Sequence, residues 1–79
     1  MKTEFRKQLN AEVANVDDQL RQVIIELQAL ASEVPSSRTR AMAVRLRSDE
    51  LRNRHANLVQ SRARWLDIIR TYTSLQEAE

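Results

Sequence analysis

Residues 34–37 read Val-Pro-Ser-Ser and include the only proline of a 79-residue chain that contains no glycine. Proline cannot donate a backbone hydrogen bond, and it disfavours the helical conformation in the residue before it. Either serine can cap a following helix, because its hydroxyl accepts a hydrogen bond from a free backbone N–H. We therefore predict two helices, over about residues 3–33 and 37–77, joined by a turn at 34–36.

Before this turn, apolar residues recur at alternating spacings of four and three residues; after it, a continuous apolar series recurs every seven residues, and the positions between its members are more polar. Such a seven-residue repeat is the pattern by which α-helices pack along one another in coiled coils. Because the connection is short, the two helices are expected to run antiparallel. We predict an all-α fold, an antiparallel two-helix coiled-coil hairpin that forms one domain over residues 1–79. The repeat comprises Leu9, Val13, Val16, Leu20, Val23, Leu27, Leu30 and Val34, and then Val44, Leu51, Leu58, Trp65 and Tyr72.

Residues at the edges of the repeat predict how the two helices align. When the turn is centred between Ser36 and Ser37, several acidic residues of the first helix fall opposite arginines of the second. Opposite charges that face each other select one register over its alternatives. The facing residues on one edge are Glu33 and Arg40, Glu26 and Arg47, and Gln19 and Arg54; on the other edge they are Asp17 and Arg52, Ile24 and Arg45, and Ala31 and Arg38.

The chain has more apolar side chains than one helix–helix interface can cover. Soluble monomers rarely expose large contiguous apolar patches. We therefore predict that two hairpins associate into a homodimeric four-helix bundle. A trimer, a higher assembly and an obligate complex with another protein are the alternatives. The predicted dimer or partner interface comprises Ile24, Ile25, Val59, Arg62, Trp65, Leu66, Ile68, Ile69, Tyr72 and Leu75.

Arginine is concentrated in the second predicted helix. The chain has a net charge of +2, yet residues 38–64 contain eight arginines against Asp49 and Glu50 alone. Such a stripe can pair with acidic residues of the same chain, with an acidic protein surface or with nucleic acid. The candidate anion or nucleic-acid contacts are Arg38, Arg45, Arg52 and Arg64, of which the first three recur every seven residues.

Few residues of this chain can support catalysis or metal binding. Cysteine is absent and His55 is the only histidine, which excludes disulfides, thiolate nucleophiles and the usual zinc sites. No glycine-rich loop is available to hold phosphate, and three aromatic residues are too few for an RNA-binding sheet that stacks bases. We expect no enzymatic activity, no cofactor and no metal. His55 is predicted to lie between the helices, opposite Val16.

No segment resembles a membrane anchor or a signal peptide. The longest unbroken apolar run is residues 41–44, far short of the ~20 residues that span a bilayer. We expect a cytoplasmic protein without a membrane partner.

These observations predict a small, non-enzymatic protein–protein interaction module that presents an apolar surface edged by arginine. Adaptors, chaperones, assembly factors and small phage-like modulators use chains of this kind. In size and layout the predicted hairpin is similar to the plasmid copy-number regulator Rop, a helical hairpin that dimerises and binds paired RNA loops. That resemblance implies the alternative function, a regulator that binds RNA through the arginines of the second helix.

Overall fold

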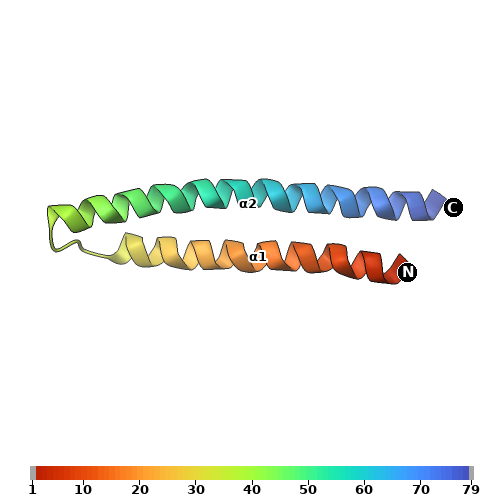
Figure 1. The fold of residues 1–79 in the computed structure, drawn as a ribbon, viewed down its shortest axis with the longest axis horizontal. Helices are drawn as coiled ribbons and strands as arrows, with labels where there is room; N and C mark the ends of the chain where they lie inside the picture. The colour runs from red at the N-terminus through yellow and green to blue at the C-terminus, as the bar shows by residue number, and fades with distance from the viewer. Residues whose placement is uncertain (1, 79) are drawn as a thin grey trace.

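The protein is a long antiparallel hairpin of two helices, α1 (Lys2–Ser32) and α2 (Arg38–Ala78) (Figure 1). The structure is a computed structural model that describes residues 2–78, and the side chains of residues 4–77. The molecule measures 63 × 16 × 14 Å, so each helix extends along most of its length. The prediction of an all-helical hairpin is confirmed.

The two ends of the hairpin differ. We call the end with the connection between the helices the turn end, and the end with both termini the open end. α2 has 41 residues and α1 has 31, and at the open end α2 extends beyond the start of α1 (Figure 1). The last turns of α2 therefore have less of α1 beside them than its central turns have.

The core is a single stripe between the helices. In the part of the chain that the structure describes, the buried apolar residues are Leu9, Val16 and Val23 of α1 and Leu51 of α2. These residues belong to the predicted repeat, and their neighbours in the repeat are half-buried from Val13 to Leu30 and from Val44 to Tyr72. The packing of one helix along the other therefore follows the seven-residue pattern. His55 is half-buried in the same stripe.

The prediction that Val34 closes the apolar repeat is wrong. α1 ends at Ser32, and Val34 lies in the connection with 90% of its surface exposed. The cause is Pro35, which disfavours the helical conformation at the residue before it. The chain leaves the helix before Val34 can reach the stripe, although its spacing from Leu30 continues the pattern.

Ser37 caps α2. Its hydroxyl accepts a hydrogen bond from the backbone N–H of Arg40 at 3.1 Å, and its carbonyl oxygen accepts one from Ala41 at 2.9 Å. The first bond satisfies an N–H group of the first turn that has no partner within the helix, and the second is the first backbone hydrogen bond of the helix itself. The prediction that a serine after the proline caps the second helix is confirmed, and the residue is Ser37.

Replacing Ser37 with alanine is expected to lower the free energy of unfolding by about 1 kcal/mol, because the cap bond to Arg40 is lost. The matched control is Ser36→Ala, for which we expect a change within about 0.5 kcal/mol. Both values come from urea unfolding followed by far-UV circular dichroism. Equal losses in the two variants would contradict the assignment of Ser37 as the cap.

Candidate interaction surfaces

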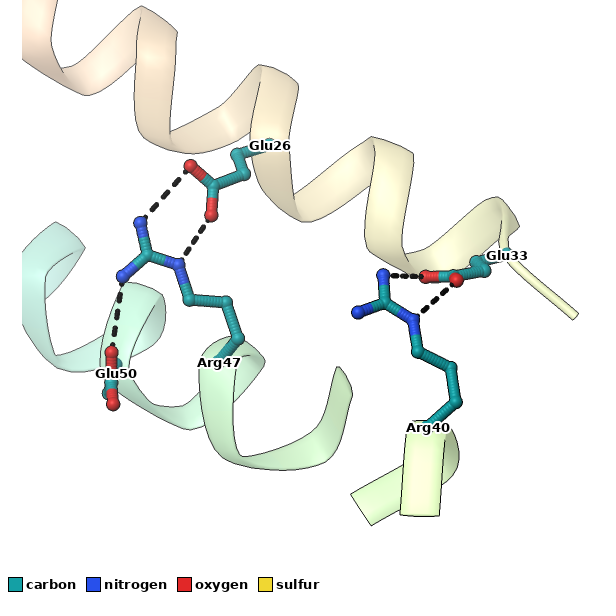
Figure 2. A network of polar contacts seen from close by, with 5 residues as sticks. All are labelled: Glu26, Glu33, Arg40, Arg47 and Glu50. Atoms are coloured by element: carbon teal, nitrogen blue, oxygen red, sulfur yellow. Dashed lines mark hydrogen bonds and ion pairs between the residues drawn. The ribbon is translucent and has the colours of Figure 1, made fainter. Parts of the chain in front are cut away.

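One edge of the hairpin carries a ladder of ion pairs, which we call the charged edge. Arg40 binds Glu33 through Nε and Nη2 at 2.7 and 2.8 Å. Seven residues further along α2, Arg47 binds Glu26 in the same bidentate way, through Nε at 2.5 Å and Nη2 at 3.2 Å (Figure 2). Arg47 also donates a hydrogen bond to Glu50 of its own helix at 3.1 Å. The two pairs of opposite charge that were predicted on this edge are confirmed.

The third predicted contact on this edge is also present. Arg54 donates a hydrogen bond to the side-chain oxygen of Gln19 at 3.4 Å. Three successive contacts at seven-residue intervals therefore fix the alignment of α2 on α1. Exposed ion pairs contribute little to stability, so their main effect here is to exclude shifted registers.

The ion pairs also change the acidity of the groups that form them. Hydrogen bonds from Arg47 lower the pKa of Glu26, and those from Arg40 lower the pKa of Glu33. The same bonds raise the pKa of Arg40 and of Arg47. Each carboxylate is thus held in its charged form by a guanidinium group from the other helix.

These shifts predict an acid-sensitive alignment. A carboxyl group whose pKa is lower in the folded protein adds stability above its unfolded pKa, and that stability is lost as pH falls. We expect the free energy of unfolding to decrease below the ordinary glutamate pKa of 4.5, and Glu26→Gln with Glu33→Gln to weaken this dependence. Urea unfolding at a series of pH values measures it.

Glu12→Gln is the matched control for this experiment. Glu12 lies on the same edge of α1 by its spacing from Glu26, but it forms no ion pair among the described side chains. We expect this variant to retain the pH dependence of the unmodified chain. If the free energy of unfolding changed equally with pH in the control and in the double variant, the role given to the two ion pairs would be contradicted.

The opposite edge carries exposed apolar residues from both helices, and we call it the apolar face. Ile24 of α1 is 42% exposed, and Val59 and Leu66 of α2 are 47% and 41% exposed. Ala56 and Ala63 lie three or four residues from Val59 and extend the same side of α2. Small and branched apolar side chains thus form a continuous strip on this side of α2, and α1 contributes to the same face.

A groove of about 360 Å³ opens on this side between the helices. α1 lines it with Ile24, Leu27 and Ala31, and α2 lines it with Arg52 and His55. The groove places the only histidine of the chain beside apolar residues, with one arginine at its margin. The prediction that His55 lies between the helices is confirmed.

The predicted pairing of Asp17 with Arg52 is wrong. Asp17 accepts a hydrogen bond from Nε of Arg62 at 2.6 Å, and Arg52 instead binds Asp49 of its own helix at 3.1 Å. Arg62 occupies a position of the stripe between the helices, where a charge without a partner is costly. Helical side chains point toward the start of their helix, and this direction lets Arg62 reach the carboxylate of Asp17.

The four candidate anion contacts have different surroundings. Among the described side chains, Arg38, Arg45 and Arg64 form no ion pair, whereas Arg52 has Asp49 as an exposed partner. Arg38 and Arg45 also line a shallow hollow of about 220 Å³ together with Met42. The turn end of α2 therefore presents two arginines that no acidic residue of the described chain neutralises.

The predicted interface residues fall into two groups by exposure. Six of them offer free surface, and the other four are half-buried in the stripe between the helices. Ile25 is exposed but directly follows Ile24, so it lies on the outer side of α1 rather than on the apolar face. The exposed group is Ile24, Ile25, Val59, Leu66, Ile68 and Leu75, and the half-buried group is Arg62, Trp65, Ile69 and Tyr72.

A second hollow, the open-end groove, lies near the termini. Its volume is about 530 Å³, and its apolar lining comes from Phe5 of α1 and from Ile68, Tyr72 and Leu75 of α2. The rings of Phe5 and Tyr72 meet edge to face, with centroids 4.9 Å apart and planes at 67°. Arg64 contributes a charged group to the lining.

Phe5 was not among the predicted interface residues, although one signal in the sequence points to it. It precedes Glu12 by seven residues and so belongs to the charged edge. On the same edge of α2, the seven-residue spacing that places Arg40, Arg47 and Arg54 nearer the turn end places Ile68 and Leu75 at the open end. This change from charged to apolar residues marks the open-end groove.

Neither helix has an apolar stretch long enough to cross a bilayer, and the described side chains contain no group of three or more potential metal ligands. The same sequence and structure were compared with known proteins. No family model matches the chain, and neither the curated proteins nor the solved structures compared with it yield a match.

Proposed function

We propose that this chain is a small protein–protein interaction module that acts as a homodimer of helical hairpins. The observation that carries the proposal is the apolar face, where Ile24, Val59 and Leu66 of two helices are each more than 40% exposed. Burial stabilises such side chains by roughly 25 cal/mol per Å² of apolar surface. A second hairpin supplies a face of the same kind, and the product is a four-helix bundle.

The arrangement of the two hairpins follows from charge. Arg38 and Arg45 have no acidic partner among the described residues, and both lie near the turn end. If the two turn ends lay together, these arginines would face their counterparts and repel them. We therefore propose that the turn ends lie at opposite ends of the bundle, where the two pairs of arginines are far apart.

A pair of spin labels tests this dimer. The chain has no cysteine, so Ser36→Cys provides one labelling site in the connection of each copy. Pulsed electron paramagnetic resonance is expected to give a distance between labels greater than half of the 63 Å length of the hairpin. A shorter distance would contradict the opposed arrangement. If no dipolar coupling between two labels were detected and the chain had a monomeric mass, the dimer would be contradicted.

Nucleic-acid binding is the second candidate function. The observation in its favour is that Arg38, Arg45 and Arg64 have no ion pair among the described side chains, while Arg38 and Arg45 recur at the same spacing as Arg52. Arginines ~10.5 Å apart on one edge of a helix can each contact phosphate. These groups would act together on a duplex or an RNA hairpin.

A salt titration with labelled RNA hairpins and duplex DNA tests the second candidate. Submicromolar affinity that falls steeply with salt would support it, because neutralisation of phosphates releases counterions. Arg38→Gln with Arg45→Gln is then expected to weaken binding and reduce the salt dependence. Absence of binding at about 0.15 M salt would remove nucleic acid as the function of these arginines.

A further inference from the structure

We propose that the open-end groove binds an amphipathic α-helix of a partner protein through apolar side chains spaced seven residues apart and an acidic side chain that meets Arg64. The inference rests on the proposed function, since it names the kind of partner that the interaction module takes. It concerns a different surface from the apolar face, so a homodimer built on that face leaves the groove open.

The shape of the groove suits a helix. Over residues 64–75, α2 carries a second stripe of exposed residues beside the one that packs on α1. Both stripes have the alternating spacing of four and three residues that lets one helix pack along another. Among the described residues, α1 covers only the first stripe at this end. The covered stripe is Trp65, Ile69, Tyr72 and Gln76, and the second stripe is Arg64, Ile68, Thr71 and Leu75.

The apolar lining fixes where a partner helix makes its main contacts. Ile68 and Leu75 are 44% and 63% exposed, and they stand ~10.5 Å apart along the helix axis. Phe5 is 45% exposed on the α1 side, with its ring against the edge of Tyr72. Two apolar side chains one heptad apart on a partner helix would lie over Ile68 and Leu75, with Phe5 flanking them.

The charges of the groove favour an acidic partner. Two charged residues line it, Arg64 and Asp67. The carboxylate of Asp67 is already held by Arg70, whereas Arg64 has no ion pair among the described side chains. The charge left for a ligand is therefore positive. The α2 helix of a second copy is a poor occupant, because it has nine arginines against four acidic residues.

Two labelled peptides and the full-length chain test the proposal. The first probe is a synthetic amphipathic helix about three heptads long, with leucine at the a and d positions and glutamate at the flanking positions. The second probe replaces every glutamate with lysine. By fluorescence anisotropy, we expect the glutamate peptide to bind at least tenfold more tightly than the lysine peptide, because only the first pairs with Arg64.

Three variants assign this binding to the groove. Arg64→Glu is expected to reverse the preference between the two peptides, which a general loss of folding cannot do. Leu75→Asp is expected to weaken binding of the glutamate peptide at least tenfold, while Leu46→Asp, a matched change at an exposed leucine outside the groove, leaves it unchanged. Light scattering is expected to give the same mass for all three variants as for the unmodified chain.

Several outcomes would overturn the proposal. One is that neither peptide binds, and another is that Arg64→Glu does not alter the preference between the peptides. A third is that Leu75→Asp converts the assembly to monomers, which would make the groove a contact between copies. Peptide binding by a chain of monomeric mass would instead contradict the proposed homodimer and leave the groove assignment standing, so the two failures are distinguishable.

Discussion

Replacing Leu51 with alanine is expected to destabilise the protein by about 2–4 kcal/mol, the largest effect of any single change considered for this chain. Leu51 is 3% exposed and is the buried apolar residue that the described part of α2 contributes to the core. Alanine would leave a cavity against α1. Because the core is a single narrow stripe, few neighbouring side chains can move to fill that cavity. Small proteins of this size have total stabilities of only about 5–15 kcal/mol.

Leu46→Ala is the control for the core substitution. It removes the same atoms from the same helix, but Leu46 is 59% exposed on the outer side. We expect a change within about 0.5 kcal/mol. Urea unfolding of both variants at one protein concentration gives the comparison, because the stability of a dimer depends on concentration. Similar losses in the two variants would show that the stripe between the helices is not the main source of stability.

Placing aspartate at both Val59 and Leu66 is expected to convert the proposed homodimer to a monomer. In a dimer with twofold symmetry each substitution occurs twice, so four carboxylates would have to be buried in the apolar face. We expect the dissociation constant to rise on the order of 100-fold or more, while helical content is retained. Sedimentation equilibrium measures the dissociation constant, and far-UV circular dichroism measures the helix.

Ile25→Asp separates this effect from a general loss of solubility or folding. Ile25 is 65% exposed, yet it lies on the outer side of α1 rather than on the apolar face. We expect dimerisation to be unchanged in this variant, although the sequence alone placed Ile25 with the interface residues. An increase in the dissociation constant equal to that of the double aspartate variant would move the dimer contact to another side of the hairpin.

The features of the fold that repeat could be predicted from the sequence. The seven-residue pattern from Leu9 to Leu30 gave the stripe between the helices, and residues at the same spacing gave the pairing of Glu26 with Arg47. Each prediction had several repeats in support, because the same geometry recurs at every second turn. Ser37 could be predicted for a local reason, since the turn and the cap depend only on adjacent residues.

The features that depend on a single long side chain could not be predicted. Helix positions alone placed Asp17 opposite Arg52, whereas Arg62 reaches Asp17 along the helix axis and forms the closer pair. The contact of Phe5 with Tyr72 likewise joins residues from different positions of the repeat. In both cases the outcome depends on side-chain length and direction, which the spacing of residues does not contain.

The central claim is that two hairpins cover each other's apolar face, and the mass of the unmodified chain in solution tests it most directly. Sedimentation equilibrium over a range of micromolar concentrations is expected to give twice the chain mass of 9.2 kDa. The dimer is expected to persist in high salt, because burial of apolar surface rather than attraction between charges holds it together. A mass of 9.2 kDa across the whole concentration range would contradict the account.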